Sequence, residues 1–486
     1  MSQSAIVVDL YLAGYPNYFH VENVSVKYLV VSSEEIRTRV TSEYPDVCVY
    51  LESDVCFWDS TYVSVTDILD YLPAQLKVYR GSVRDMNKKI YDSKIESMYY
   101  SSLAFWIYHF QGGVDLFMLF QSAEHGNFFD SVPLAVSKKM GIPAISTDLT
   151  LVGKSGYWFF AVKEHVTGRY IDLTEVCNWE QIVDFHDLIF HTVSNEKLPD
   201  SPKALEYPKW FRKLYYHCVN SKLSLVAFFS GKLAGTTRDS IGGVPFEIRY
   251  SDYLRFKSYM RSLKRNYLKH SVSELNPNTN AIIYAMHFEP EASIMNRTIY
   301  NSQLYNIRML AASLPKDWIL YVKEHPDTFR VSIKNAYFML TMSNYRNKQY
   351  YSDILSIPNV RLLGIDMSSH YLLNHPQVKA ISTINGTISV EAMESKKPVL
   401  LFDSSSIPYM NIDDLFFISS IEDLKDAMSK LESGFQPTYN QYTMLISRYL
   451  CISKYDTKGI DLSPTCLSKV IEYVISLSNK NNGCDS

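Results

Sequence analysis

Two stretches of the chain decide its fold: Trp318-Ile319-Leu320-Tyr321-Val322-Lys323-Glu324-His325-Pro326 and Val378-Lys379-Ala380-Ile381-Ser382-Thr383-Ile384-Asn385-Gly386-Thr387-Ile388-Ser389-Val390-Glu391-Ala392. In each, a short apolar run typical of a buried parallel strand leads into polar residues. Ligands of open α/β sheets bind at the carboxyl ends of the strands. The sequence therefore predicts a βαβ series with functional groups at its strand ends.

The first stretch presents a histidine at a strand end. Pro326 lacks a backbone donor and biases His325 toward extended geometry, so the imidazole is not wound into a helix. Lys323 lies just before it. We expect Lys323, His325 and Pro326 to form part of a ligand-binding site at this strand end.

The second stretch combines a turn with a helix start. Gly386 can take the turn without steric cost, and a helix is expected from about Ser389 with Glu391 in its first turn. Backbone N–H groups at a helix start suit an anion such as phosphate. The remaining predicted residues of this ligand-binding site are Ser382, Thr383, Asn385, Gly386, Thr387 and Glu391.

Each motif alone has a structural interpretation. A histidine at a strand end is more often a satisfied structural group than a ligand, and a Gly-Thr turn is often only a helix cap. Because both motifs occur at predicted strand ends of one βαβ series, the functional interpretation is favoured.

The pair resembles the C-terminal domain of the bacterial capsule polysaccharide biosynthesis family, whose best-known members transfer Kdo. It is also similar to the His-Pro and Ser/Thr motifs of bacterial sialyltransferases. The resemblance is strongest from Ala281 to about Met410, where it includes His287-Phe288-Glu289-Pro290-Glu291-Ala292 and Leu314-Pro315, and weaker from Val114 to about Asp148. It implies donors that are CMP-activated 2-keto sugar acids, and it implies that the residues of the predicted ligand-binding site bind the nucleotide.

Length and composition suit such an enzyme. A chain of 486 residues is long enough for two domains of about 200 residues each. Short apolar runs alternate with helical stretches near the start, which indicates a parallel α/β domain. We expect a GT-B-like α/β fold, with two Rossmann-type doubly wound domains facing each other across a cleft. The predicted domains are an acceptor-side domain over 1–275, with a helical insertion, and a nucleotide-sugar-binding domain over 276–486.

Charge and cysteine usage indicate which partners and which cellular compartment to expect. A net charge of −3 gives no general attraction to nucleic acid, and no run approaches the length of a membrane span. The seven cysteines are odd in number and lack a Cys-x-x-Cys pair, so we interpret them as reduced thiols in a cytoplasm. A peripheral position at the cytoplasmic face of the inner membrane is compatible with this.

Acidic residues at loop positions are the candidates for acid–base work. Glu124 follows the apolar run 114–120 and could face His325 from the other domain, although a cap or a surface charge is about equally expected. Asp239 lies in the glycine-rich segment 231–243, which is typical of a mobile loop. His287, at the end of the strand predicted over 281–285, completes the predicted catalytic set. Asp148 is a weaker candidate.

Further elements are expected along the chain. A helix over 252–270 is rich in Lys and Arg and is either a solvated face or a contact for anionic lipid or an acidic glycan. Residues 271–280 suit an interdomain linker. Helices are expected over 421–432, 439–450 and 467–477, and the last could cross back onto the N-terminal domain.

The resemblance implies transfer of Kdo, or of a nonulosonic acid such as sialic, legionaminic or pseudaminic acid, from CMP to a capsule or lipopolysaccharide acceptor with retention. No Asp-x-Asp metal motif is present, so no metal and no cofactor are expected. Two alternatives stay open. One is a UDP-sugar GT-B enzyme, in which Glu391 could bind ribose; the other is a non-catalytic capsule-assembly protein.

Overall fold

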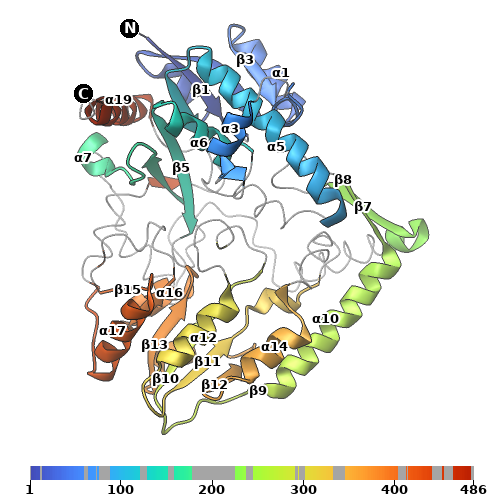
Figure 1. Ribbon diagram of the computed structural model, residues 1–486, viewed down its shortest axis with the longest axis vertical. Coiled ribbons are helices and arrows are strands. Elements are labelled where there is room, and N and C mark those ends of the chain that lie inside the picture. Colours follow the sequence, from blue (N-terminus) through green and yellow to red (C-terminus); the bar gives the residue numbers. More distant parts are fainter. Residues whose placement is uncertain are drawn as a thin grey trace, which may run out of the picture.

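The computed structural model contains two parallel-rich sheets, which lie at opposite ends of the long axis of the molecule (Figure 1). It describes residues 2–10, 14–59, 64–72, 74–75, 88–120, 128–151, 158–177, 225–236, 245–289, 294, 302–331, 345–402, 412, 414–439, 451–453 and 463–482. Among these, no helix is long and apolar enough to cross a membrane.

The first sheet has seven strands in the order β16-β6-β5-β4-β1-β2-β3. The strands are β1 (Gln3–Val8), β2 (Val24–Val31), β3 (Cys48–Leu51), β4 (Leu116–Leu119), β5 (Ala144–Leu151), β6 (Trp158–Glu164) and β16 (Cys451–Ser453). From β1 to β5 every pairing is parallel, and β6 is antiparallel to both of its neighbours. Without β16 this is the 3-2-1-4-5-6 order of a Rossmann-type domain.

Helices cover both faces of the first sheet. One face packs against α2 (Glu52–Cys56), α5 (Lys88–Gln111) and α6 (Ser131–Lys139). On the other face lie α1 (Glu34–Glu43), the short helix η1 (Asn17–His20), α7 (Leu173–Cys177) and α19 (Pro464–Asn482). Because both faces are covered, the central strand β4 is apolar throughout, and all four of its residues are buried.

The second sheet repeats the same topology in the order β15-β14-β13-β10-β11-β12-β9, with every pairing parallel. The strands are β9 (Ser271–Val272), β10 (Ala281–Ala285), β11 (Ile319–Lys323), β12 (Val360–Leu363), β13 (Val378–Thr383), β14 (Val399–Leu401) and β15 (Phe416–Phe417). Leaving out β9, the order is again 3-2-1-4-5-6. The fold is therefore α/β with two Rossmann-type doubly wound sheets, as predicted.

The second sheet is also covered on both faces. Against one face pack α10 (Tyr250–His270), α12 (Gln303–Ser313), α14 (Lys348–Leu355) and α17 (Ile421–Glu432). The other face carries α15 (Ser369–Asn374) and α16 (Ile388–Glu394). α10 and β9 precede the predicted boundary at residue 275, yet both belong to the second sheet and its core.

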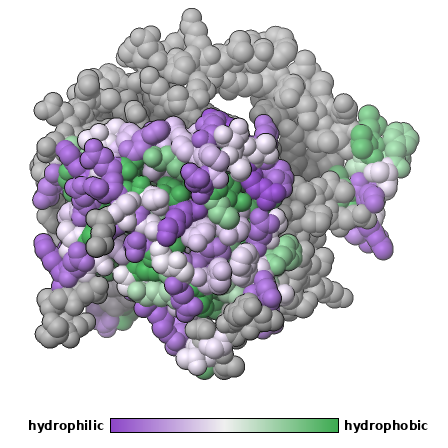
Figure 2. Space-filling model, turned by 90° about the horizontal axis from the view of Figure 1, so that it is seen from above, coloured by the Kyte–Doolittle hydropathy of each residue, from purple (hydrophilic) through white to green (hydrophobic). Residues whose placement is uncertain are grey.

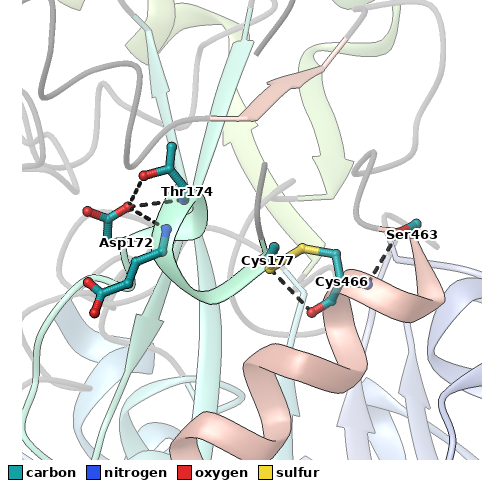
Figure 3. The surroundings of a disulfide bond; sticks show 6 residues. Asp172, Thr174, Cys177, Ser463 and Cys466 are labelled. Atoms are coloured by element: carbon teal, nitrogen blue, oxygen red, sulfur yellow. Dashed lines mark hydrogen bonds between the residues drawn. A yellow bond between two sulfur atoms is a disulfide. The ribbon is translucent and has the colours of Figure 1, made fainter. Parts of the chain in front are cut away.

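The last described elements return to the first sheet, as the sequence predicted for the final helix. β16 pairs with β6, and Leu467, Val470 and Val474 of α19 pack into the core beneath β1 and β2. A disulfide between Cys177 of α7 and Cys466 of α19 joins positions 289 residues apart (Figure 3). The expectation that all seven cysteines are reduced thiols is therefore wrong for this pair, because folding brings the two thiols together.

Two further expectations differ from the structure. Residues 231–243 were expected to form a loop throughout, but β7 (Lys232–Thr236) pairs with β8 (Pro245–Arg249) as an antiparallel hairpin. Residues 271–280 were expected to form a linker, but Ser271 and Val272 pair with β12. The helix predicted over 439–450 lies outside the described residues from position 440 onward.

Candidate functional site

Three neighbouring strands of the second sheet bring the predicted residues together. β10 lies between β11 and β13, and all three run parallel, so their carboxyl ends meet at one edge. The strand order reverses between β10 and β13, which is the position where doubly wound sheets bind ligands. His287 follows β10, His325 follows β11, and the turn 383–387 follows β13.

The imidazole of His287 lies directly against the turn after β13. The backbone N–H of Asn385 donates to Nε2 of His287 at 3.2 Å, and Oγ1 of Thr383 lies 3.2 Å from the same nitrogen. Since Nε2 accepts a hydrogen bond, the neutral ring carries its proton on Nδ1. His287 therefore couples the ends of the two strands that border the switch point.

Position 386 requires a glycine, because its backbone lies close to the side chains of Thr383 and His287. A Cβ at this position would lie 2.9 Å from Oγ1 of Thr383 and 3.4 Å from Nε2 of His287. The backbone N–H of Gly386 also donates to Oγ1 of Thr383 at 3.3 Å. The sequence predicted a glycine turn, and the structure adds that the glycine makes room for the imidazole.

The backbone of His287 is fixed by two side chains. Gln303, at the start of α12, accepts from the N–H of His287 at 2.6 Å and donates to its carbonyl at 3.1 Å. Nη2 of Arg346 donates to the same carbonyl at 3.0 Å. Gln303 and Arg346 are buried, so the position of His287 is set from beneath the site.

Arg346 also pairs with two buried carboxylates. Its Nη1 contacts Glu289, and its Nε donates to Oε2 of Glu324 at 2.7 Å. Burial alone would lower the pKa of Arg346, but the carboxylates of Glu324 and Glu289 outweigh it and hold this pKa well above its usual value. The guanidinium therefore stays charged and ties the loop after β10 to the end of β11.

Glu324 in turn positions His325. Oε1 of Glu324 accepts from the backbone N–H of His325 at 2.8 Å, and its Oε2 accepts from the hydroxyl of Tyr351 at 2.7 Å. Nδ1 of His325 accepts from the backbone N–H of Asp327 at 3.2 Å, so a proton on the neutral ring resides on Nε2. The His325 ring lies 6.2 Å from that of Phe288. His325 is thus held as the cap of η3 (Pro326–Phe329).

Lys323 is partly buried beside this loop. Its ammonium donates to the carbonyl of Ile365 at 3.2 Å. Burial lowers the pKa of Lys323, and the nearby carboxylates of Asp366, Glu324 and Glu391 oppose that shift.

The other residues that the sequence predicted for the site differ in burial, and two of them lie outside the described residues. Ser382 is fully buried within β13, and its hydroxyl has no hydrogen-bond partner among the described residues. Thr387 is exposed before α16 and makes no side-chain cap, and Pro326 is exposed at the start of η3. Glu124 and Asp239, two of the three predicted catalytic residues, lie outside the described residues.

Sequence reasoning missed Gln303, Glu324 and Arg346 as parts of this site. Glu324 lies inside the quoted Lys-Glu-His-Pro stretch, but its role depends on a partner 22 positions away. Arg346 lies in a segment whose sequence has no motif. The signal that could have found the pair is the presence of charged residues beside strands that are otherwise apolar, since buried charges must be paired.

The first sheet has a buried acid in the corresponding place. Asp9, directly after β1, is fully buried and accepts from the backbone N–H of Gly14 at 2.8 Å. A Cβ on Gly14 would lie 2.5 Å from the ring of Phe120, at the end of β4. Within the part of the chain that the structure describes, no group of three His, Cys, Asp or Glu side chains could hold a metal ion.

Comparison with known proteins identifies no family. No family model matches the chain, and no curated protein matches it. The resemblance to the capsule polysaccharide biosynthesis family therefore rests on the motifs quoted above.

Solved structures that match include three carbohydrate-related proteins. The UDP-GlcNAc 2-epimerase of Methanocaldococcus jannaschii has 9% identity and a TM-score of 0.24, and the match covers 97% of this chain and 100% of that chain. The β-Kdo 2,7 transferase KpsC of Thermosulfurimonas dismutans has 10% identity and a TM-score of 0.28, and the match covers 87% of this chain and 99% of that chain. The wall teichoic acid polymerase TagF has 10% identity and a TM-score of 0.23, and the match covers 99% of this chain and 90% of that chain. Similarity at this level does not identify a substrate.

Proposed function

We propose that the protein is a glycosyltransferase that moves a 2-keto sugar acid from its CMP donor to a capsule or lipopolysaccharide acceptor. One observation carries the proposal: His287, His325 and the turn 383–387 meet at the carboxyl ends of three adjacent strands, at the switch point of a Rossmann-type sheet. That position favours a nucleotide ligand. The motifs shared with CMP-sugar enzymes favour CMP.

The donor phosphate would lie among His325, Lys323 and the turn after β13. The proton on Nε2 of His325 and the ammonium of Lys323 supply positive or donating groups, and Thr387 and Asn385 supply polar groups at the start of α16. During transfer the bond between the anomeric carbon and the phosphate oxygen breaks, and CMP leaves with growing charge. Donors already in place stabilise that charge as it develops.

The acceptor hydroxyl forms the new bond to the anomeric carbon and loses its proton to a base. Glu124, Asp239 and His287 remain the proposed acid–base residues, with Glu124 the first choice, as base or as nucleophile in a retaining reaction. His287 also holds the turn 383–387 in place. We propose that no metal ion or cofactor takes part.

The proposed location is the cytoplasmic side of the inner membrane. The disulfide between Cys177 and Cys466 argues against this location, because disulfides are rare in reducing compartments such as the cytoplasm. Mass spectrometry of alkylated protein from intact cells tests the location. Alkylation of Cys177 would agree with a cytoplasmic enzyme. Complete formation of the disulfide between Cys177 and Cys466 would instead place the protein in an oxidising compartment.

The first experiment is a calorimetric and thermal-shift titration with CMP beside UDP. A ligand that binds only the native state raises its stability by mass action, so we expect stabilisation by CMP and a weaker response to UDP. His325→Ala should weaken CMP binding by roughly tenfold, as expected for loss of one hydrogen bond to a charged group. His370→Ala, at an exposed position on α15, is the matched control and should bind as the unaltered protein does.

The other outcomes select the alternatives. Preference for UDP would replace the CMP donor by a UDP-sugar and would direct attention to Glu391 as a ribose-binding residue. A protein that binds neither nucleotide would be a capsule-assembly protein that keeps the fold without the activity.

A further inference from the structure

Residues 225–230 form a short helical segment that presents large apolar side chains to solvent. Phe229 is 82% exposed, Phe228 is 65% exposed, and Leu225 and Val226 are each 58% exposed. Contiguous exposed apolar side chains usually mark an interaction site. Figure 2 shows hydrophobic side chains gathered at the edge of the molecule where Figure 1 places β7, β8 and the start of α10.

The segment is anchored from its opposite side. Ala227 is 2% exposed and packs in a small core with Ile248 of β8 and Tyr253 of α10. The ring of Phe228 lies 6.4 Å from that of Tyr250 in an edge-to-face arrangement. The apolar side chains are therefore held outward by a folded support.

The helix that supports the segment is strongly basic. Its six cationic residues are Arg255, Lys257, Arg261, Lys264, Arg265 and Lys269. Its acidic residue is Asp252. The whole chain has a net charge of −3, so positive charge is concentrated on α10 against the overall balance.

The exposed face of α10 combines both chemistries. Arg261, Arg265 and Lys269 are exposed on it, and Leu254 and Leu268 are 47% and 40% exposed. The opposite face buries Tyr253, Met260, Leu263 and Tyr267. The apolar side of α10 is therefore occupied by the core, and its solvent side offers cations that can contact anionic headgroups.

Two more cations adjoin the apolar segment. Lys232 of β7 and Arg249 of β8 are cross-strand partners in the hairpin, and both are exposed. Both cations can therefore contact the headgroups of an anionic surface that Phe228 and Phe229 enter.

We propose that residues 225–230, the β7–β8 hairpin and the exposed face of α10 form a docking surface for an anionic lipid bilayer. The phenylalanine, leucine and valine side chains enter the interface, and the Lys and Arg side chains contact the headgroups. A soluble acidic glycan could pair with the cations, but it offers no apolar phase for Phe228 and Phe229. The surface does not depend on which nucleotide the second sheet binds.

Flotation of the full-length protein with vesicles tests the proposal. Vesicles of phosphatidylethanolamine with phosphatidylglycerol should bind the protein, and phosphatidylcholine vesicles should not. The double variant Phe228→Ser/Phe229→Ser should weaken binding by at least about tenfold, because each buried phenylalanine contributes substantially. Arg261→Ser/Arg265→Ser should weaken it by about tenfold and reduce its dependence on salt.

Insertion itself is measured with Phe229→Trp. Brominated acyl chains should quench the added fluorescence in anionic vesicles, whereas the matched control Phe57→Trp, at a side chain 66% exposed on the first domain, should show no added quenching. Unchanged melting temperature and unchanged nucleotide binding would show that the variants are folded. Equal vesicle binding by the serine variant, or binding to soluble polygalacturonate with no quenching by lipid, would overturn the proposal.

Discussion

Nε of Arg346 donates to Oε2 of Glu324 at 2.7 Å, and both side chains are completely buried. The same guanidinium reaches Glu289 and the carbonyl of His287. Since Glu324 also accepts from the backbone of His325, one buried cation links the two histidines at the ends of β10 and β11. The candidate site therefore depends on residues that no ligand would touch.

Replacing Arg346 by methionine should be strongly destabilising. The substitution leaves Glu289 and Glu324 buried without their counter-charge, which typically costs about 3–5 kcal/mol. Urea unfolding measures the change in the free energy of unfolding. Arg330→Met is the control, because Arg330 pairs with Asp327 with a side chain 77% exposed and should change stability by less than about 1 kcal/mol. Equal losses in the two variants would contradict the role given to Arg346.

Tyr350 and Tyr351 make a matched pair on α14. The hydroxyl of Tyr351 donates to Glu324 at 2.7 Å, whereas the buried hydroxyl of Tyr350 has no hydrogen-bond partner among the described residues. Tyr351→Phe should cost about 1–3 kcal/mol of unfolding free energy, and Tyr350→Phe should be neutral or stabilising. Thermal unfolding of the two variants side by side measures the difference, and the reverse order would refute this account of Glu324.

Gly386→Ala should damage ligand binding more than stability. Its Cβ would crowd Oγ1 of Thr383 and Nε2 of His287, so the turn or the imidazole must move. We expect CMP affinity, measured by calorimetry, to fall by roughly tenfold, the size of one lost hydrogen bond. Gly364→Ala adds a Cβ 3.5 Å from the carbonyl of Val272, an ordinary contact, and should bind normally. Normal CMP affinity of Gly386→Ala would show that this turn does not contribute to nucleotide binding.

Glu52 should make stability depend on pH. Burial raises the pKa of Glu52 from 4.5 to about 7. The folded protein therefore binds more protons than the unfolded chain between these values, and the free energy of unfolding falls as pH rises through that window, by about 1–3 kcal/mol. Urea titrations at pH 5 and pH 8 should show a smaller fall for Glu52→Gln than for the unaltered protein. Glu35→Gln, exposed on α1, should keep the full dependence.

The sheet positions were predictable from sequence because their strands are short apolar runs bounded by turns. The runs at 319–322 and 380–382 became β11 and β13, and the helix after Gly386 begins within one residue of its predicted start. Such a run does not by itself distinguish a buried strand from a buried helix, so its short length and the flanking turns decide the prediction. The hairpin at 232–236 was missed because glycine and threonine masked a pairing that depends on residues 245–249.

The site was predictable only where its groups are close in sequence. His325 and Gly386 carry local signals in the proline beside one and the turn around the other. The contacts of Arg346 and Gln303 with His287 span 59 and 16 positions, and nothing in the local pattern encodes them. Long-range pairing of buried polar groups was likewise the reason that the link between Cys177 and Cys466 was not anticipated.

The return of α19 to the first sheet has a consequence for biosynthesis. Leu467, Val470 and Val474 leave the ribosome after the entire second sheet, yet they complete the core beneath β1 and β2. The half of the protein that is translated first is therefore finished last, and the part of its apolar face that α19 covers stays exposed while the other half matures. Exposed nascent surface of this kind is prone to aggregate, so translation of this chain should create a demand for chaperones that a molecule with two sequentially completed halves would not.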